Sequence, residues 1–315
     1  MVQADATRAR GIRNKHRLSL GNNYTLHLML LPSVILLFIF SYLPMFGIVM
    51  AFQNYKPGPN FGFFGSKFAG LDNFRYIFRM PDAMLVIRNT VSIAVMKIIC
   101  HMVIPVIVSL LLNEIRRTGF KRGVQLIMYL PHFLSWVILA GIFRDILSPS
   151  EGIINHMLKS VGFEPIFFLG DLKWFQPTMV ITDVWKEFGY NLILYMAALT
   201  AIDPSLYEAA TVDGANRFQQ TIHITLPGII SVVVLLLTLS MGNVLNAGFD
   251  QIFNLYSPQV YSVGDIIDTL VYRLGIEDMQ FSVSAAVGLF KSVVSFVLIS
   301  TSYYLAYRFA DYRIF

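Results

Sequence analysis

The chain has 315 residues, of which 56% are hydrophobic and 14% charged, and its formal net charge is +5. A soluble domain carries charge at about a quarter of its positions, so this composition excludes an ordinary soluble protein and indicates a chain that crosses a membrane repeatedly. The single cysteine, Cys100, excludes disulfides and a cysteine-based metal site, and no base-stacking motif supports a nucleic-acid partner for the positive charge.

The first element is a basic segment, 1–25, followed by an apolar run from Leu26 to Phe52. That run is much longer than the apolar region of a cleavable signal peptide. We therefore expect it to remain as the first membrane span, with the basic segment before it in the cytoplasm.

Apolar stretches of about 20 residues cross a bilayer as helices, because only a helix or a closed barrel satisfies its own backbone in lipid. By this rule we predict an all-α polytopic membrane protein in which residues 26–315 form a single transmembrane domain. Prolines inside the predicted spans, at positions 32, 44, 105 and 131, mark candidate kinks. The six predicted spans are Leu26–Phe52, Thr90–Leu112, Val124–Leu147, Pro177–Ala201, Gly228–Asp250 and Ala285–Tyr307.

The orientation follows from the lysines and arginines, which are densest before the first span and between the second and third spans. Basic residues gather on the cytoplasmic side of membrane proteins. Both termini are therefore expected in the cytoplasm. Three loops near 54–89, 148–176 and 251–284 are expected outside, and none is long enough to form a domain of its own.

The segment 203–227, between the fourth and fifth spans, carries a helix-start signal in Asp203-Pro204. We predict a short helix over Pro204–Val212, a turn at Gly214 and a second short helix over about Asn216–Thr225. Pro227 is expected to separate this second helix from the fifth span. The pair carries few charges, so its apolar face requires a partner to cover it.

The residues Glu208-Ala209-Ala210, then Gly214, then Ile224-x-Leu226-Pro227 resemble the EAA loop of ABC importer permeases in sequence and spacing. The run LTAIDPSLYEAATVDGANR and the stretch Gly70-Leu71-Asp72-Asn73-Phe74 are similar to the carbohydrate-uptake branch of that family. The resemblance implies that the segment is a coupling helix pair seated in a groove of a cytoplasmic ATPase. The residues expected to serve this contact are Glu208, Ala209, Ala210, Asp213, Gly214, Phe218, Ile222, Ile224, Leu226 and Pro227.

Two alternatives remain for this segment. It could lie on lipid headgroups, although an interfacial helix normally carries several lysines or arginines and this one has Arg217 alone. Phe218 and Ile222 could equally pack on their own helix bundle.

Polar residues inside the predicted spans are expensive in lipid and usually face a cavity or a partner. Asp183 and Asn243 lie roughly 10 Å inside the outer edges of their spans, at about 1.5 Å per residue, so both would face an outward-opening polar chamber. There Trp185 and Tyr190 could stack on sugar rings. Pairing within the bundle, such as Asp183 with Lys186, is the alternative. The candidate cargo contacts are Asp183, Trp185, Lys186, Glu187, Tyr190, Asn191, Asn243 and Asn246.

The resemblance implies the permease subunit of an ATP-driven importer in the inner membrane of a bacterium, carrying an oligosaccharide or related carbohydrate. It further implies a second homologous permease, two cytoplasmic ATPase subunits and an extracytoplasmic solute-binding protein, with membrane lipid around the spans. This chain lacks the GxxxxGK[ST] phosphate loop, so ATP and Mg²⁺ are expected on the partner ATPase. No cofactor, catalytic residue or metal site is expected here.

Three other functions stay open at this point. An ion-coupled secondary transporter would show inverted repeats with broken helices, and no such symmetry is visible. An importer permease for a solute other than a sugar would need few changes. A membrane enzyme acting on a lipid-linked sugar would need clustered acidic residues at one membrane face.

Overall fold

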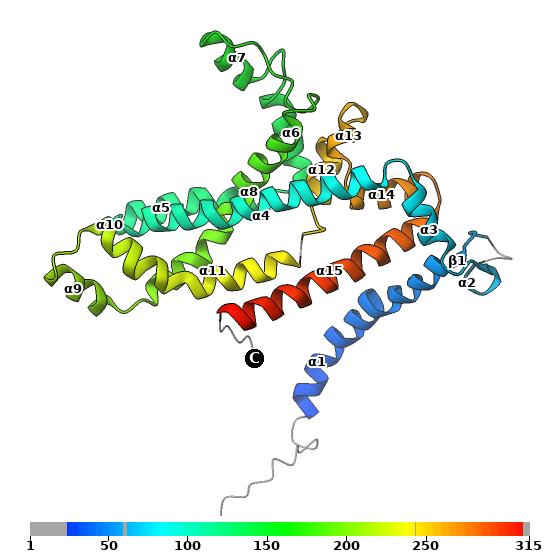
Figure 1. Ribbon diagram of the computed structural model, residues 1–315, viewed down its shortest axis with the longest axis horizontal. Coiled ribbons are helices and arrows are strands. Elements are labelled where there is room, and N and C mark those ends of the chain that lie inside the picture. Colours follow the sequence, from blue (N-terminus) through cyan, green and yellow to red (C-terminus); the bar gives the residue numbers. More distant parts are fainter. Residues whose placement is uncertain (1–23, 59–61, 243, 311–315) are drawn as a thin grey trace, which may run out of the picture. The chain divides into compact units, whose positions relative to one another are not determined.

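The computed structural model describes residues 24–58, 62–242 and 244–310, so nearly all of the basic segment 1–25 lies outside the described residues. The chain groups into two units, 1–47 and 48–315. In the first unit, α1 (Tyr24–Leu37) continues through a π-helical turn at Phe38–Tyr42 into a 3₁₀ helix that begins at Leu43. These elements form the first of the predicted spans (Figure 1).

The second unit is almost entirely helical and follows the colour order of Figure 1 from cyan to red. The 3₁₀ helix that begins at Leu43 ends at Phe52. Further 3₁₀ turns lie at Leu130–Phe133 and Pro258–Val260, and π-helical turns at Thr221–Thr225 and Arg273–Glu277. The remaining elements are β1 (Gln53–Asn54), α2 (Gly62–Gly65), β2 (Lys67–Phe68), α3 (Asp72–Arg79), α4 (Ala83–Asn113), α5 (Thr118–Tyr129), α6 (Trp136–Ile146), α7 (Ile153–Ser160), α8 (Phe175–Thr200), α9 (Pro204–Val212), α10 (Arg217–Gln220), α11 (Leu226–Met241), α12 (Phe249–Leu255), α13 (Tyr261–Gly264), α14 (Ile267–Tyr272) and α15 (Phe281–Ala310).

Four helices of the described chain are long and apolar enough to cross a membrane, and a bent pair makes a possible fifth. The four are His27–Phe52, Ala83–Asn113, Arg217–Met241 and Phe281–Tyr304. The predicted fourth span corresponds to α8, which has 26 residues but carries Asp183, Lys186 and Glu187. Its length suffices to span a bilayer. The count of six spans therefore stays a prediction, while the helical membrane architecture is confirmed.

The predicted third span, Val124–Leu147, is not one straight helix. It is divided between Thr118–Phe133 and Trp136–Ile146, whose axes differ by 103°. Pro131 lies at the break, where proline removes a backbone donor and clashes with the preceding turn. The second helix starts afresh because the Ser135 hydroxyl accepts from the Ile138 N–H. The candidate kink at this proline is a full break.

The predicted fifth span was placed too far toward the C-terminus, because α11 ends at Met241 and not at Asp250. Gly248, with φ of +95°, precedes the separate helix α12. The carbonyl of Ala247 accepts a hydrogen bond from Lys97 Nζ at 2.8 Å instead of continuing a helical ladder. A buried lysine and a left-handed glycine thus hold the non-helical residues just before α12.

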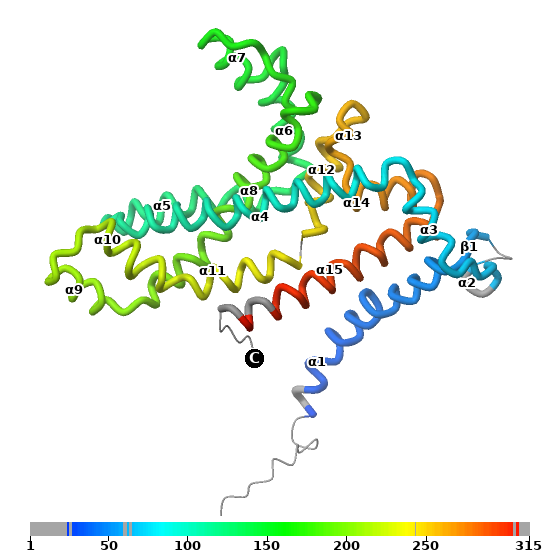
Figure 2. Tube along the Cα trace, viewed as in Figure 1, coloured from blue at the N-terminus to red at the C-terminus, as the bar shows by residue number. Residues whose placement is uncertain are grey.

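The helices α4 and α8 pack along each other, and α8 also contacts α5 and α11 (Figures 1 and 2). Their contact buries Ile93, Met179 and Phe175 among residues that follow α11, in one apolar cluster. A second cluster joins α14 and α15 to the end of the first span, and a third joins α8 to α11 near their other ends. This packing encloses one cavity between polar side chains of α4 and α8 and the chain that follows α11.

The loop that follows the first span is held to the end of that span by a small hairpin. Strands β1 and β2 pair antiparallel, with Gln53 opposite Phe68. The buried Asn73 amide donates to the carbonyls of Ala51 at 2.9 Å and of Gln53 at 3.0 Å. Gly70 adopts a left-handed φ of +57° in the turn before α3. The Gly70–Phe74 stretch thus has a structural role, holding this loop to the helix.

Candidate functional site

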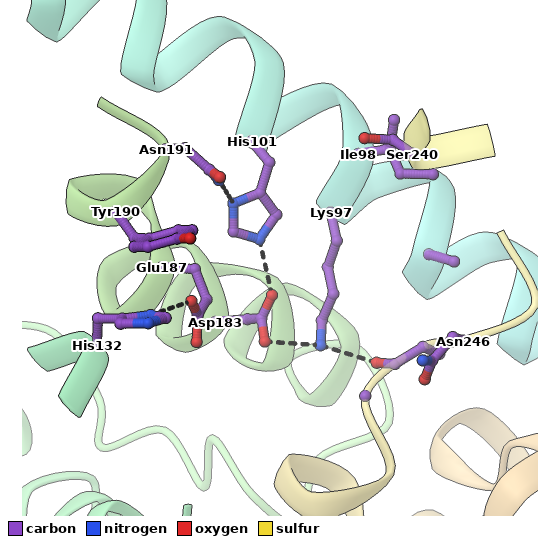
Figure 3. A pocket seen from close by; sticks show the side chains of 13 residues that line it. Lys97, Ile98, His101, His132, Asp183, Glu187, Tyr190, Asn191, Ser240 and Asn246 are labelled. Carbon is purple, nitrogen blue, oxygen red and sulfur yellow. Dashed lines mark hydrogen bonds and ion pairs between the residues drawn. The ribbon is translucent and has the colours of Figure 1, made fainter. Parts of the chain in front are cut away.

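A cavity of about 440 Å³ opens between α4, α8 and the residues that follow α11. Its volume falls within the range of roughly 300–1,000 Å³ that is typical of small-molecule sites. Figure 3 shows that the polar side chains of α4 and α8 point toward one another across it. The lining residues are Ala94, Lys97, Ile98, His101, His132, Asp183, Glu187, Tyr190, Asn191, Ser240, Asn246, Ala247 and Gly248.

Asp183, on α8, is held by two bases of α4 (Figure 3). Its Oδ1 lies 3.1 Å from Lys97 Nζ and its Oδ2 lies 2.8 Å from His101 Nε2. The Asn191 amide lies 3.2 Å from the other ring nitrogen of His101. With that amide as donor, Nδ1 accepts and Nε2–H donates to the carboxylate. The buried charge of Asp183 is therefore balanced by Lys97.

Lys97 on α4 contacts α8, the residues before α12 and α12 itself. Besides Asp183, its ammonium donates to the Ala247 carbonyl at 2.8 Å and to Gln251 Oε1 at 2.5 Å. The Gln251 amide in turn donates to α8, at the Thr182 hydroxyl, over 2.7 Å. A side chain at Gly248 would place its Cβ only 2.8 Å from Lys97 Nζ, and its φ is left-handed as well, so glycine is required there.

Glu187 forms a second charge cluster, one helical turn further along α8. Its two carboxylate oxygens contact His132 Nδ1 at 2.6 Å and Lys186 Nζ at 2.5 Å. The Tyr190 ring stacks on the His132 ring, with centroids 4.5 Å apart and planes 12° apart. This stacked pair gives one wall of the cavity a flat aromatic surface, as Figure 3 shows.

Five of the eight residues proposed from the sequence as cargo contacts line this cavity. They are Asp183, Glu187, Tyr190, Asn191 and Asn246. Trp185 and Lys186, although described, are outside its lining. Trp185 packs edge-on against Phe143 at 5.7 Å, and the Lys186 ammonium donates to Glu187 and the His132 carbonyl. Asn243 lies outside the described residues.

The ion pairs also differ from the sequence-based alternative, which joined Asp183 to Lys186. Asp183 instead contacts Lys97 and His101, since those two residues share one face of α4 at a spacing of one helical turn. Their spacing was visible in the sequence, but which helix they face was not. His132 received no role from the sequence. Its position next to Pro131, where the helix breaks, places the ring beside α8.

The segment between α8 and α11 has the predicted local structure. The helix α9 spans Pro204–Val212 as expected, and Asp203 caps it by accepting from the Ser205 N–H at 2.9 Å. This backbone hydrogen bond lowers the pKa of the Asp203 carboxyl. Gly214 has a left-handed φ of +80°. Asn216 and Gln219 then form a capping box at the start of α10.

Most residues predicted for partner contact in this segment lie on the surface. Phe218 is 73% exposed, and Val212, which precedes the predicted residue Asp213, is 88% exposed. Such apolar side chains in water are costly unless another molecule covers them. The exposed members are Glu208, Ala209, Asp213, Gly214, Phe218, Ile222 and Pro227, and the half-buried ones are Ala210, Ile224 and Leu226.

One expectation for this segment is wrong, because Pro227 does not separate it from the next span. The chain is helical without interruption from Arg217 to Met241. A π-helical turn occupies Thr221–Thr225, where the Leu226 N–H donates to the Thr221 carbonyl. This wider turn accommodates the ring and the missing N–H of the proline.

Known proteins resemble this chain over most of its length. Residues 101–315 match the family described as "Binding-protein-dependent transport system inner membrane component". The chain is 42% identical over 290 residues to Protein LplB of Bacillus subtilis (strain 168), covering 92% of this chain and 91% of that protein. It is 41% identical over 290 residues to the polygalacturonan/rhamnogalacturonan transport system permease protein YteP of the same strain, covering 92% and 90%.

A solved structure is also similar, a bacterial alginate ABC transporter in complex with alginate pentasaccharide-bound periplasmic protein. It superposes with a TM-score of 0.82 at 37% identity, covering 91% of this chain and 95% of that chain. The relatives thus share almost the whole chain, and the family match covers more than half of it. The chain therefore belongs to the family of binding-protein-dependent transport system inner membrane components, a family of transport permeases.

Proposed function

We propose that this chain is the permease subunit of an ATP-driven importer and that it translocates an oligosaccharide handed over by an extracytoplasmic solute-binding protein. The observation that carries the proposal is the cavity between α4 and α8, which combines balanced charges with a stacked aromatic wall. In a membrane-spanning bundle, polar groups of this kind mark a path for a polar solute.

The chemistry of the cavity suits sugar hydroxyls, which both donate and accept hydrogen bonds. Asp183 and Glu187 offer acceptors, while Asn191 and Asn246 offer amide groups of both kinds. Each carboxylate already contacts two basic side chains. A sugar hydroxyl would therefore bind to a network in which the carboxylate charges are already balanced. The His132–Tyr190 pair supplies a flat face for a sugar ring.

The relatives support a saccharide cargo. One is named for the transport of polygalacturonan and rhamnogalacturonan, and the similar solved structure is of an alginate transporter bound to a pentasaccharide-loaded periplasmic protein. By extension we assign this chain an oligosaccharide cargo and a solute-binding protein that docks at the outer loops.

The segment 203–227 is proposed as the coupling contact with the ATPase. Its exposed apolar side chains, Val212 and Phe218, need a partner surface, and its turn at Gly214 depends on a left-handed residue. We further propose six spans with both termini in the cytoplasm, a second homologous permease and two ATPase subunits, which hold the ATP and Mg²⁺. The permease would alternate between an outward-open and an inward-open state. The ATPases can shift the populations of these two states only if they interact with them differently.

The test is uptake by the complete complex in proteoliposomes, loaded with ATP inside and supplied with binding protein and oligosaccharide outside. We expect uptake that requires ATP and persists when a protonophore and a sodium ionophore dissipate ion gradients. Glu208→Arg should abolish stimulation of ATP hydrolysis by the cargo. Uptake that follows an ion gradient and needs no ATP would instead establish an ion-coupled transporter.

A further inference from the structure

A second cavity, of about 700 Å³, lies on the other side of the segment that follows α11. It is formed by α12, α14 and α15 together with the end of the first span. Asn246 lines both this cavity and the one between α4 and α8. The residues that line the second cavity are Met50, Asn246, Phe249, Asp268, Val271, Tyr272, Gly275, Ile276, Phe281, Ser284, Ala285, Gly288 and Lys291.

The polar centre of the second cavity is an ion pair between α14 and α15. Lys291 Nζ lies 2.5 Å from Asp268 Oδ1, and both side chains are about four-fifths buried. Asp268 Oδ2 is buried and has no hydrogen-bond partner among the described residues. The Lys291 ammonium has three donor positions, and its recorded contact is with Asp268. The pair is thus neutral as a whole, and it can still accept a hydrogen bond at Asp268 Oδ2 and donate from the Lys291 ammonium.

This combination matches a hydroxyl group better than an ion. A hydroxyl donates one hydrogen bond and accepts others, so it can use the spare acceptor of Asp268 and a spare donor of Lys291 together. The carboxylate reaches different orientations because its terminal torsion is only weakly restricted. A lone anion or cation would meet a site whose charges already cancel.

Aromatic rings stand beside the ion pair. Phe249 and Tyr272 both line the cavity, with ring centroids 5.8 Å apart. Gly288 of α15 also lines the cavity, and a side chain there would meet no neighbouring atom within 4 Å of its Cβ, so this part of α15 borders open space. Ring faces beside a neutral polar pair are the same combination that characterises the first cavity.

We infer that the second cavity is a further saccharide subsite, so that an oligosaccharide in transit places successive rings on both sides of Asn246. The inference rests on the proposed function, since it extends the same cargo path. It assigns Asp268 and Lys291 to hydroxyl binding and Phe249 and Tyr272 to ring stacking. A longer oligosaccharide gains contacts here that a disaccharide in the first cavity does not reach.

The test uses Gly288→Leu, which fills the open space from a helical glycine. The matched control is Gly141→Leu on α6, another glycine whose Cβ meets no atom within 4 Å. The measurement is stimulation of ATP hydrolysis by the full complex with its binding protein. The probes are galacturonan, alginate and maltodextrin ladders of two to six rings, titrated separately at each length.

For Gly288→Leu we expect a higher concentration of oligosaccharide to be needed for half-maximal stimulation of ATP hydrolysis. The rise should be at least tenfold for penta- and hexasaccharides and less than twofold for the shortest stimulating oligosaccharide. Asp268→Asn, which keeps the shape of the side chain, should show the same dependence on length with a smaller change. Gly141→Leu should match the wild type at every length.

Equal changes at all lengths, or none, would overturn the inference while leaving the proposed function intact. Loss of the second permease from Gly288→Leu and Asp268→Asn complexes on size exclusion would also overturn it, by making the cavity a contact between subunits. If no ladder stimulates the wild-type complex at any length, the proposed saccharide cargo fails, and the subsite fails with it.

Discussion

The cavity between α4 and α8 and the segment 203–227 are built by opposite means. In the cavity, the ion pair of Lys97 with Asp183 joins residues from different helices and is largely buried. In the segment, the determining contacts are local, such as the cap at Asp203 and the turn at Gly214, and the side chains are exposed. The first region is stabilised by the fold of this chain, whereas the second leaves apolar side chains on the surface, where we propose that a partner covers them.

The largest effect is expected from Asp183→Asn, which leaves the ammonium of Lys97 buried without a counter-charge. Removing one partner of a buried ion pair costs on the order of 3 kcal/mol. We expect a clear fall in the melting temperature of the detergent-solubilised complex, with uptake lowered about 100-fold because the polar wall of the cavity is disrupted.

The double variant Lys97→Met with Asp183→Leu is the control for this experiment, because it removes both charges. It should recover most of the thermal stability without recovering uptake. Full stability in the single variant would show that the pair is not a structural part of the cavity.

The second prediction concerns the turn in the exposed segment. Gly214→Val places a β-branched residue at a left-handed φ, at a cost of roughly 1–2 kcal/mol. Cargo-stimulated ATP hydrolysis should fall about tenfold, while the melting temperature of the solubilised permease stays close to the wild type. Gly214→Asn, which tolerates this backbone conformation, should retain most activity. Equal losses for both variants would separate the turn from coupling.

These two predictions reflect what the sequence alone can reveal. The helix α9 and the glycine turn were predicted because their signals lie within a few residues of each other. The pairing of Asp183 was not, because it depends on which face of α4 turns toward α8. The limit of α11 was misplaced because the chain leaves the helix after Met241, and beyond that point the Ala247 carbonyl bonds to a lysine 150 positions earlier.

The contact surface itself provides the third prediction. Phe218 is 73% exposed on α10, and truncating an apolar residue that contributes to a protein interface costs on the order of 1.4 kcal/mol. Phe218→Ala should weaken ATPase binding about tenfold, measured by titrating ATPase onto permeases in nanodiscs. Phe163→Ala, with a similarly exposed ring in the loop between α7 and α8, is the matched control. Equal affinity for both variants and the wild type would remove Phe218 from the interface.

The smallest effect is expected at the aromatic wall of the cavity. Tyr190→Ala removes a ring stacked on His132, and such pairs contribute about 0.5–1.5 kcal/mol. The concentration of saccharide that half-stimulates hydrolysis should rise about three- to tenfold. Tyr190→Phe keeps the ring and should stay within twofold of the wild type. A stronger effect in Tyr190→Phe than in Tyr190→Ala would assign the role to the hydroxyl.

The uninterrupted helix from Arg217 to Met241 has a mechanical consequence. Its 25 residues extend for about 38 Å at 1.5 Å per residue, with Phe218 near one end and the approach to Asn246 just beyond the other. No non-helical residue divides this length, so the helix can carry an axial displacement from Phe218 to Ser240, which lines the cavity between α4 and α8. Under the proposed function, a movement of the ATPase contact would therefore reach the wall of the cargo cavity in the same step.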